Sequence, residues 1–363
     1  MDTRTSIVST LEDLIRFQST IDHPEERKRC ADYIEEFFRG TPLHVRRFTH
    51  NNVPSVVVTK GDSKHPKVFL YGHFAVVPGT EEQFVPRRDG DKLIGRGALD
   101  MKGGLAVLMT LMKDLADTGH SVGLLAVGDE EVGGFNSTGY LIKEEGYRCD
   151  AVVMPDSGMT IHQIVTKEKG LVRVTFTASG VSAHGSRSWL GESAVDKLIE
   201  TIQTMKTFFL PLAEHPDDHW VRTLNVGKII AGNAFNQVPP EAVADCDIRF
   251  TETDDSADLL ARMRSSLPAG VRMDIVGLSD GVFIDTAHPM MQSYQAAVRT
   301  IGREPVYISA HGRSDATFFT PLGIPVIQGQ PDGESHHGPD EWVSVKALGE
   351  YYEVVRRFVE MAG

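Results

Sequence analysis

Three short apolar runs constrain the fold of this chain most, because each is nearly continuous. They cover residues 68–71, 124–127 and 151–154. Such runs are typical of strands in a parallel sheet that helices cover on both faces. Between the first two runs, residues 103–115 carry leucine and methionine at the spacing of one helical face, which predicts a crossover helix. The pattern therefore predicts an α/β fold with a parallel-rich central sheet.

Polar residues follow each of these runs. Open α/β sheets place their ligands at the carboxyl ends of parallel strands, so these residues are candidates for a functional site. A catalytic zinc ion takes three protein ligands from His, Asp, Glu or Cys and keeps one position open. The chain offers five such candidates, each at the end of an apolar run or in a glycine-rich loop: His73, Asp100, Glu131, Asp156 and His337.

Other catalytic classes lack their motifs. The glycine-rich segment 95–104 has Asp100 where a dinucleotide fingerprint requires its last glycine, and no Walker A sequence is present. A serine nucleophile motif G-x-S-x-G is absent, since the nearest match, residues 180–184, ends in His184. The sequence H-E-x-x-H is absent too, which excludes a zinc site built on one helix.

Charge and length exclude further classes. The 363 residues carry a net charge of −13, which repels phosphate backbones and anionic lipid, so nucleic acid is not an expected partner. No apolar stretch approaches the roughly 20 residues of a membrane span. The N-terminus lacks a basic and then apolar leader, and three cysteines form no C-x-x-C pair. We therefore expect a cytoplasmic protein with reduced thiols.

The pattern of elements changes near residue 170. From there to about residue 276 the chain is expected to alternate as strand, helix, strand, strand, helix, strand, the split β-α-β-β-α-β arrangement of a two-layer domain. Helix and strand patterns then resume after residue 284. We predict one domain made of residues 1–169 and 284–363, and an inserted α+β, ferredoxin-like domain at 170–283.

Seven ordered segments resemble one enzyme family, and the resemblance covers nearly the whole chain. The family is that of the co-catalytic zinc aminoacylases and carboxypeptidases, which includes acetylornithine deacetylase, succinyl-diaminopimelate desuccinylase and glutamate carboxypeptidase. The segments are GHFAVVP (72–78), GRGALDMKGG (95–104), DEEVGG (129–134), PDS (155–157), SAH (182–184), NQVP (236–239) and HGPDE (337–341).

The resemblance implies a zinc-peptidase-like catalytic domain with two zinc ions, for which cobalt or manganese are the alternatives. His73 and Asp156 would hold one ion, Glu131 and His337 the other, and Asp100 would bridge them.

The resemblance also implies that Glu130 is the general base. Adjacent carboxylates repel each other unless a cation lies beside one of them. Glu130 and Glu131 could therefore act as general base and metal ligand, respectively. The alternative is a charged turn. His337 is preferred to His336 as the last ligand, because the family's last ligand lies four residues before a glutamate, here Glu341.

For the inserted domain, the resemblance implies a lid that also forms a homodimer. His184 would be donated across that interface to stabilise the oxyanion. Asn236 and Arg249 match lid positions that contact the substrate, and a guanidinium suits a carboxylate. A salt bridge from Arg249 to Asp245 or Asp247 is the alternative.

Arg313, in the loop at 312–316, would also meet the carboxylate of the substrate. The expected activity is therefore cleavage of the amide bond in an N-acyl amino acid or short peptide that bears a free carboxylate.

One departure concerns the first motif, which is His-x-Asp in the family and His73-Phe74-Ala75 here. Loss of such a partner typically lowers metal affinity or activity about 10- to 100-fold, because the imidazole loses its fixed tautomer and orientation. We therefore expect an amidohydrolase whose activity is impaired by Ala75. The alanine at this position is explained either by an engineered substitution or by a natural change. The alternatives are a non-catalytic metal- or ligand-binding homologue and an interaction module that uses the inserted domain.

Overall fold

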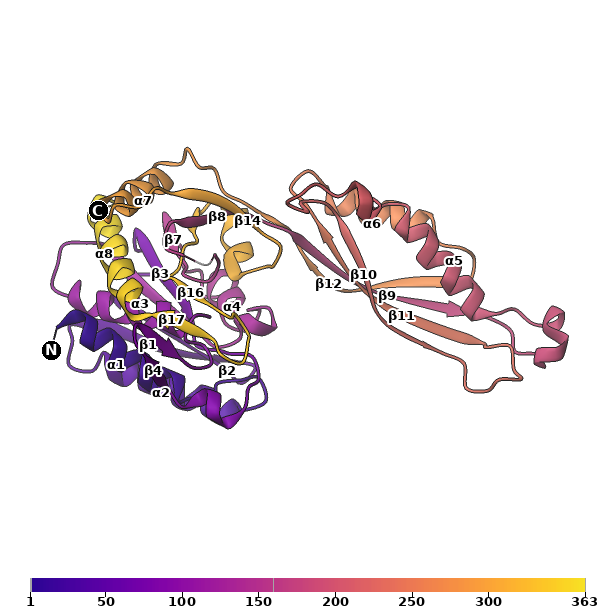
Figure 1. Cartoon of the computed structure of the whole chain (residues 1–363), viewed down its shortest axis with the longest axis horizontal. Coiled ribbons are helices and arrows are strands. Elements are labelled where there is room, and N and C mark those ends of the chain that lie inside the picture. The colour runs from indigo at the N-terminus through magenta and orange to yellow at the C-terminus, as the bar shows by residue number, and fades with distance from the viewer. Residues whose placement is uncertain (1, 159, 363) are drawn as a thin grey trace. The chain divides into compact units, whose positions relative to one another are not determined.

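The computed structural model describes residues 2–158 and 160–362, and its chain forms two compact units (Figure 1). The first unit runs through Thr166 and continues with Ile284–Ala310 and the chain from Ser314 onward. The second unit contains Lys167–Phe283 and His311–Arg313. The chain leaves the first unit through β8 (Gln163–Glu168) and returns through β13 (Val282–Phe283). No helix among the described residues is both long and apolar enough to cross a membrane.

The first unit is built on a six-stranded sheet in which the strands β6, β3, β7 and β15 run parallel. Strands β1 and β2 extend it in antiparallel pairing. The sheet order is β1 (Leu43–His50), β2 (Val53–Lys60), β6 (Val122–Val127), β3 (Val68–His73), β7 (Ala151–Val153) and β15 (Val326–Ile327). The three apolar runs of the sequence are β3, β6 and β7, all fully buried, so the predicted parallel-rich α/β sheet is confirmed.

Helices cover this sheet. The predicted crossover helix is α3 (Lys102–Asp114), which is buried along nearly its whole length because it packs on β3 and is itself covered by α1 and α8. Helix α2 packs on β2, and α7 packs on α8. The other helices of this unit are α1 (Thr3–Ile15), α2 (Pro24–Phe37), α4 (Thr138–Lys143), α7 (Pro289–Thr300) and α8 (Val345–Ala362).

A small second sheet brings distant loops of the first unit together. Its order is β16 (Gly333–Glu334), β17 (Trp342–Ser344), β5 (Lys92–Ile94) and β4 (Arg87–Asp89). The pairing of β17 with β5 holds the loop at 335–341 beside the glycine-rich segment at 95–104. The other elements described in this unit are β14 (Val306–Ala310) and the short 3-10 helices η1 (Glu81–Phe84), η2 (Glu130–Val132), η5 (Asp315–Phe318) and η6 (Thr320–Leu322). Two further 3-10 helices, η3 (Gly185–Leu190) and η4 (Leu212–Glu214), belong to the second unit.

The second unit is a two-layer α+β domain of four antiparallel strands and two helices. Its chain order is β9 (Gly170–Ser179), α5 (Ala194–Lys206), β10 (Thr223–Ala231), β11 (Glu241–Phe250), α6 (Ser256–Ser265) and β12 (Val271–Ser279). The sheet order is β10-β11-β9-β12, with every pair antiparallel. This is the β-α-β-β-α-β arrangement that the sequence predicts.

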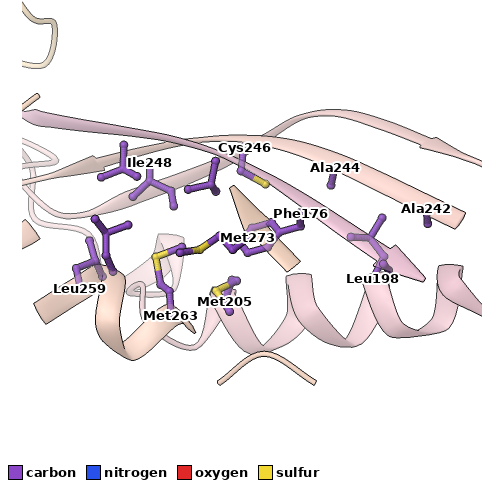
Figure 2. Packing of buried hydrophobic residues seen from close by; sticks show 14 of the residues in the cluster. Phe176, Leu198, Met205, Ala242, Ala244, Cys246, Ile248, Leu259, Met263 and Met273 are labelled. Atoms are coloured by element: carbon purple, nitrogen blue, oxygen red, sulfur yellow. The ribbon is translucent and has the colours of Figure 1, made fainter. Parts of the chain in front are cut away.

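The core of the second unit lies between its sheet and its two helices (Figure 2). Strand β9 alternates buried and more exposed residues, so Val172, Val174, Phe176 and Ala178 all point into this core. Phe176 is the largest of them and is completely buried.

Phe176→Ala should lower the free energy of unfolding by about 3–5 kcal/mol, because the lost ring leaves a cavity in a closely packed core. Arg173→Ala is the matched control on the same strand, since Arg173 is exposed and a change there should stay within about 0.5 kcal/mol. Denaturant unfolding of the full chain measures both. Equal stability losses in the two variants would contradict the packing described here.

Candidate metal centre

The carboxyl ends of three adjacent parallel strands supply most of the site. His73 is the last residue of β3. Glu130 and Glu131 begin the short helix η2 just after β6, and Asp156 follows β7. Because β3 lies between β6 and β7, these side chains gather at one edge of the sheet.

Asp100 lies at the centre of this group and contacts imidazoles through both carboxylate oxygens. Its Oδ1 lies 3.0 Å from Nε2 of His73. Its Oδ2 lies 2.6 Å from Nε2 of His336 and 2.9 Å from Nε2 of His337. A carboxylate that faces imidazoles on both sides has the geometry of a bridging ligand between two metal positions.

The remaining acids flank the two sides of Asp100. Oδ1 of Asp156 lies 3.4 Å from Nε2 of His73. Oε2 of Glu131 lies 3.3 Å from Nε2 of His337. The structure thus brings together His73 with Asp156, and Glu131 with His337, around one shared carboxylate.

Glu130 lies beside the first of these pairs, with Oε2 3.8 Å from Nε2 of His73. Burial raises its pKa well above the usual range, and the neighbouring charge of Asp156 adds to that effect. Burial also raises the pKa of Asp156 to about 7, although contact with His73 opposes it.

The pKa values of the histidines are raised, whereas the pKa of Asp100 is lowered. Burial alone would lower the pKa of His73, but its hydrogen bonds with Asp100 and Asp156 raise it well above the usual value. Burial alone would raise the pKa of Asp100, but the three histidines hold it well below its usual range. Contacts with Asp100 and then Glu131 raise the pKa of His337 to about 10. Cations are therefore strongly favoured beside these carboxylates.

The residues fit a pair of metal ions. Oδ2 of Asp156 and Oε1 of Glu131 are buried and have no hydrogen-bond partner, although buried carboxylate oxygens normally have one. The donor atoms of His73, Asp100 and Asp156 lie within 4.8 Å of one another, and so do those of Asp100, His336 and His337. Imidazole and carboxylate donors of this kind suit zinc, cobalt or manganese.

Two adjacent histidines compete for the last ligand position. The rings of His336 and His337 stack with centroids 4.3 Å apart, and both contact Asp100. Of these two histidines, only His337 also faces Glu131 among the described residues, and its role as the last ligand stays a prediction. The sequence pattern did not reveal that His336 lies so close to Asp100.

The structure changes one part of the expectation for Ala75. Nδ1 of His73 donates a hydrogen bond to the backbone oxygen of Ala75 over 2.9 Å. This bond keeps Nε2 as the nitrogen that is free to bind a metal. The tautomer and orientation of His73 are therefore retained, and only the negative charge expected at position 75 is missing.

Glu341 anchors the glycine-rich loop that carries Asp100. Its Oε1 accepts hydrogen bonds from the backbone N–H groups of Leu99 and Asp100, and its Oε2 accepts one from Arg96. Arg96 also donates to the backbone oxygen of His337. In the sequence, Glu341 marks only the position of His337, which precedes it by four residues.

Asp315 is a second buried acid that the sequence analysis missed. Its Oδ2 accepts a hydrogen bond from the hydroxyl of Tyr71 over 2.6 Å and another from Thr138. Its charge contributes to the raised pKa of Glu130, so it belongs to the electrostatic surroundings of the site.

The candidate substrate residues of the second unit have partners within that unit. His184 accepts from the backbone of Ser186, and the N–H of the next residue, Gly185, donates to the oxygen of Asn236, which brings two candidate positions together. Arg249 donates to Asp247 over 2.7 Å, which is the salt bridge left open as the alternative.

Arg313 donates to Ser279 over 3.0 Å, also within the second unit. The roles of these four residues toward a substrate stay predictions.

A comparison with protein-family models identifies the family of this chain, and similar sequences are found among known proteins. A family model described as peptidase family M20/M25/M40 matches residues 69–361. A succinyl-diaminopimelate desuccinylase from Methylobacterium is 28% identical over 99% of this chain and 97% of that protein.

Solved structures share the fold. Aminopeptidase PepT from Bacillus cereus superimposes with a TM-score of 0.81 at 17% identity, covering 99% of this chain and 98% of that one. A Bacillus subtilis protein described as a dinuclear metal-binding peptidase of family M20 has a TM-score of 0.72 at 12% identity, covering 98% and 97% of the two chains.

Proposed function

This chain belongs to peptidase family M20/M25/M40, and from that premise we propose that it is a dizinc amidohydrolase. Its substrate is an N-acyl amino acid or a short peptide with a free carboxylate. The observation that carries the proposal is the position of Asp100, whose two oxygens face His73 on one side and His337 on the other.

Five residues would hold the two ions. His73 and Asp156 would bind one, Glu131 and His337 the other, and Asp100 both. When bound, the ions supply Lewis acidity toward the scissile carbonyl and lower the pKa of a bound water. The unpaired oxygens of Asp156 and Glu131 support this assignment.

Glu130 is the general base of the proposed reaction. Its carboxylate takes a proton from the attacking water and later gives it to the nitrogen of the leaving amine. Its pKa is raised by burial, which suits a group that must hold a proton between these two steps.

The second unit would complete the site as a lid. We propose that His184 stabilises the oxyanion and that Asn236, Arg249 and Arg313 bind the carboxylate of the substrate. Arg249 would then exchange or share its contact with Asp247.

We also propose that the inserted domain at 170–283 forms a homodimer interface. Support comes from the apolar side chains exposed on this unit, among them Trp189, Ile229, Ile230 and Phe235. Strand β10, which carries two of them, is an edge strand. A cytoplasmic location is proposed as well, because all three cysteines are free.

A non-catalytic homologue is the second candidate, and Ala75 is the observation that favours it. Both candidates predict metal binding, and they differ in turnover.

Ala75→Asp should raise turnover about tenfold, the lower end of the 10- to 100-fold range for such partners, since the backbone oxygen of Ala75 already orients His73. The measurement is a hydrolysis screen of N-acyl amino acids and dipeptides with the parent chain and the variant. Ala75→Asn is the matched control, because it adds similar bulk without the charge. Metal binding without turnover in both the parent and Ala75→Asp would favour the non-catalytic homologue.

A further inference from the structure

A small cavity of about 70 Å³ lies in the first unit, beside Ala75. A cavity needs only about 10–15 Å³ of such volume to hold a water molecule, so this one has room for several heavy atoms. Arg27 from α2 and Gly128 after β6 also line it. It borders the metal centre only through Glu131, and none of its lining residues belongs to the second unit.

The guanidinium of Arg27 is buried in the wall of this cavity with poor hydrogen bonds. Arg27 is 4% exposed, and its Nε is buried without a partner. Its two terminal nitrogens lie 3.4 Å from the backbone oxygen of Gly128 and 3.5 Å from that of Ile21. Both distances exceed the usual 2.7–3.2 Å of an N–H···O hydrogen bond, so these contacts are weak.

Arg27 also lacks a direct counter-ion. None of the carboxylates in residues 2–158 and 160–362 forms an ion pair with it, and Asp129 acts on it only through its charge. The oxygens of Asp129 instead accept hydrogen bonds from the N–H of Asn136 and from the hydroxyl of Ser137. Buried arginines are normally paired, since an isolated charge is unfavourable away from water.

The other acid at the cavity has a partner of its own. Oε2 of Glu131 faces His337 over 3.3 Å, and no ion pair joins Glu131 to Arg27 among the described residues. The cavity therefore combines an unpaired buried guanidinium with open space. Ala75, at the position where the family's His-x-Asp motif has its acid, leaves that space unfilled.

We propose that this cavity binds a small carboxylate the size of formate or acetate through Arg27. Paired N–H groups of a guanidinium match the two oxygens of a carboxylate, and both hydrogen bonds are charge-assisted. The bound anion supplies the negative charge that an aspartate at position 75 would provide. The site borders the metal centre through Glu131, and anion binding there does not require the proposed activity.

The test is a titration of the purified full chain with ¹³C-formate, in which NMR measures the line width of the formate signal. Sodium gluconate keeps the ionic strength constant. It is chosen because its carboxylate belongs to a molecule too large for the cavity. We expect saturable broadening with a dissociation constant on the order of 10 mM. The titration is repeated after dialysis against a chelator, since formate also binds metal ions.

Two variants and one control make the result specific. Arg27→Met removes the charge at similar length, and Ala75→Asp fills the cavity with a covalent carboxylate; each should abolish the saturable broadening. Arg29→Met, on the same helix but with a side chain that is 66% exposed, should leave it unchanged.

Should Arg27→Met fail to fold, Ala75→Asp still decides the outcome. No saturable broadening in the parent chain would overturn the proposal. Broadening that persists in Ala75→Asp would also overturn it, and would identify the binding as adventitious.

Discussion

Replacing Glu130 with glutamine in an Ala75→Asp background should lower kcat by about 100- to 10,000-fold, the range of general acid–base catalysis. Glutamine keeps the size and shape of the side chain but cannot accept a proton. Its nearest histidine nitrogen is 3.8 Å away, beyond hydrogen-bond distance, so the change should leave the metal content at its parental value. Steady-state hydrolysis and elemental analysis of the same preparations test both parts.

A matched control separates this effect from a general loss of charge. Glu144→Gln removes an exposed carboxylate in the same region of the chain and should leave kcat unchanged. Parental turnover in Glu130→Gln would show that another group takes the proton. A parallel loss of metal would instead make Glu130 a ligand.

Asp100→Ala should have the largest effect on metal binding. Asp100 is the only residue in the described parts of the chain that joins the two donor groups, and it contacts three histidines. Its loss should lower metal affinity by more than the roughly 100-fold upper limit seen for residues that only support a ligand. Activity should fall with the metal content.

Elemental analysis after gel filtration measures this change, and circular dichroism shows whether the variant is folded. Asp117→Asn is the control, because Asp117 is an exposed acid in the same domain. A folded Asp100→Ala protein that keeps two metal ions per chain would exclude the bridging role.

The parts of this protein that the sequence predicts well are those determined by local pattern. Strands β3, β6 and β7 are continuous apolar runs, because both faces of each strand are buried. Helix α3 has a regular apolar face. Candidate ligands at the ends of such strands can therefore be placed at one edge of the sheet before any coordinates are known.

The parts that sequence could not predict depend on backbone groups and side-chain orientation. The oxygen of Ala75 that holds His73 has no side-chain signature. The proximity of His336 to Asp100 follows from the course of a loop that β17 and β5 hold in place. Arg27 resembles a surface residue of an amphipathic helix in sequence, yet it is buried.

The sequence alone does not decide which carboxylate Arg249 binds. A guanidinium on the lid suits both a substrate carboxylate and a neighbouring aspartate. The side chain of Asp247 lies two residues away on the same strand, and Arg249 contacts it through two nitrogens.

Elemental analysis of the metal content tests most directly the claim that Asp100 joins two metal positions. The purified parent chain and Ala75→Asp are each equilibrated with zinc, passed through gel filtration and measured for metal per chain. Two zinc ions per chain in both proteins is the predicted result. No bound metal in either protein would contradict the claim.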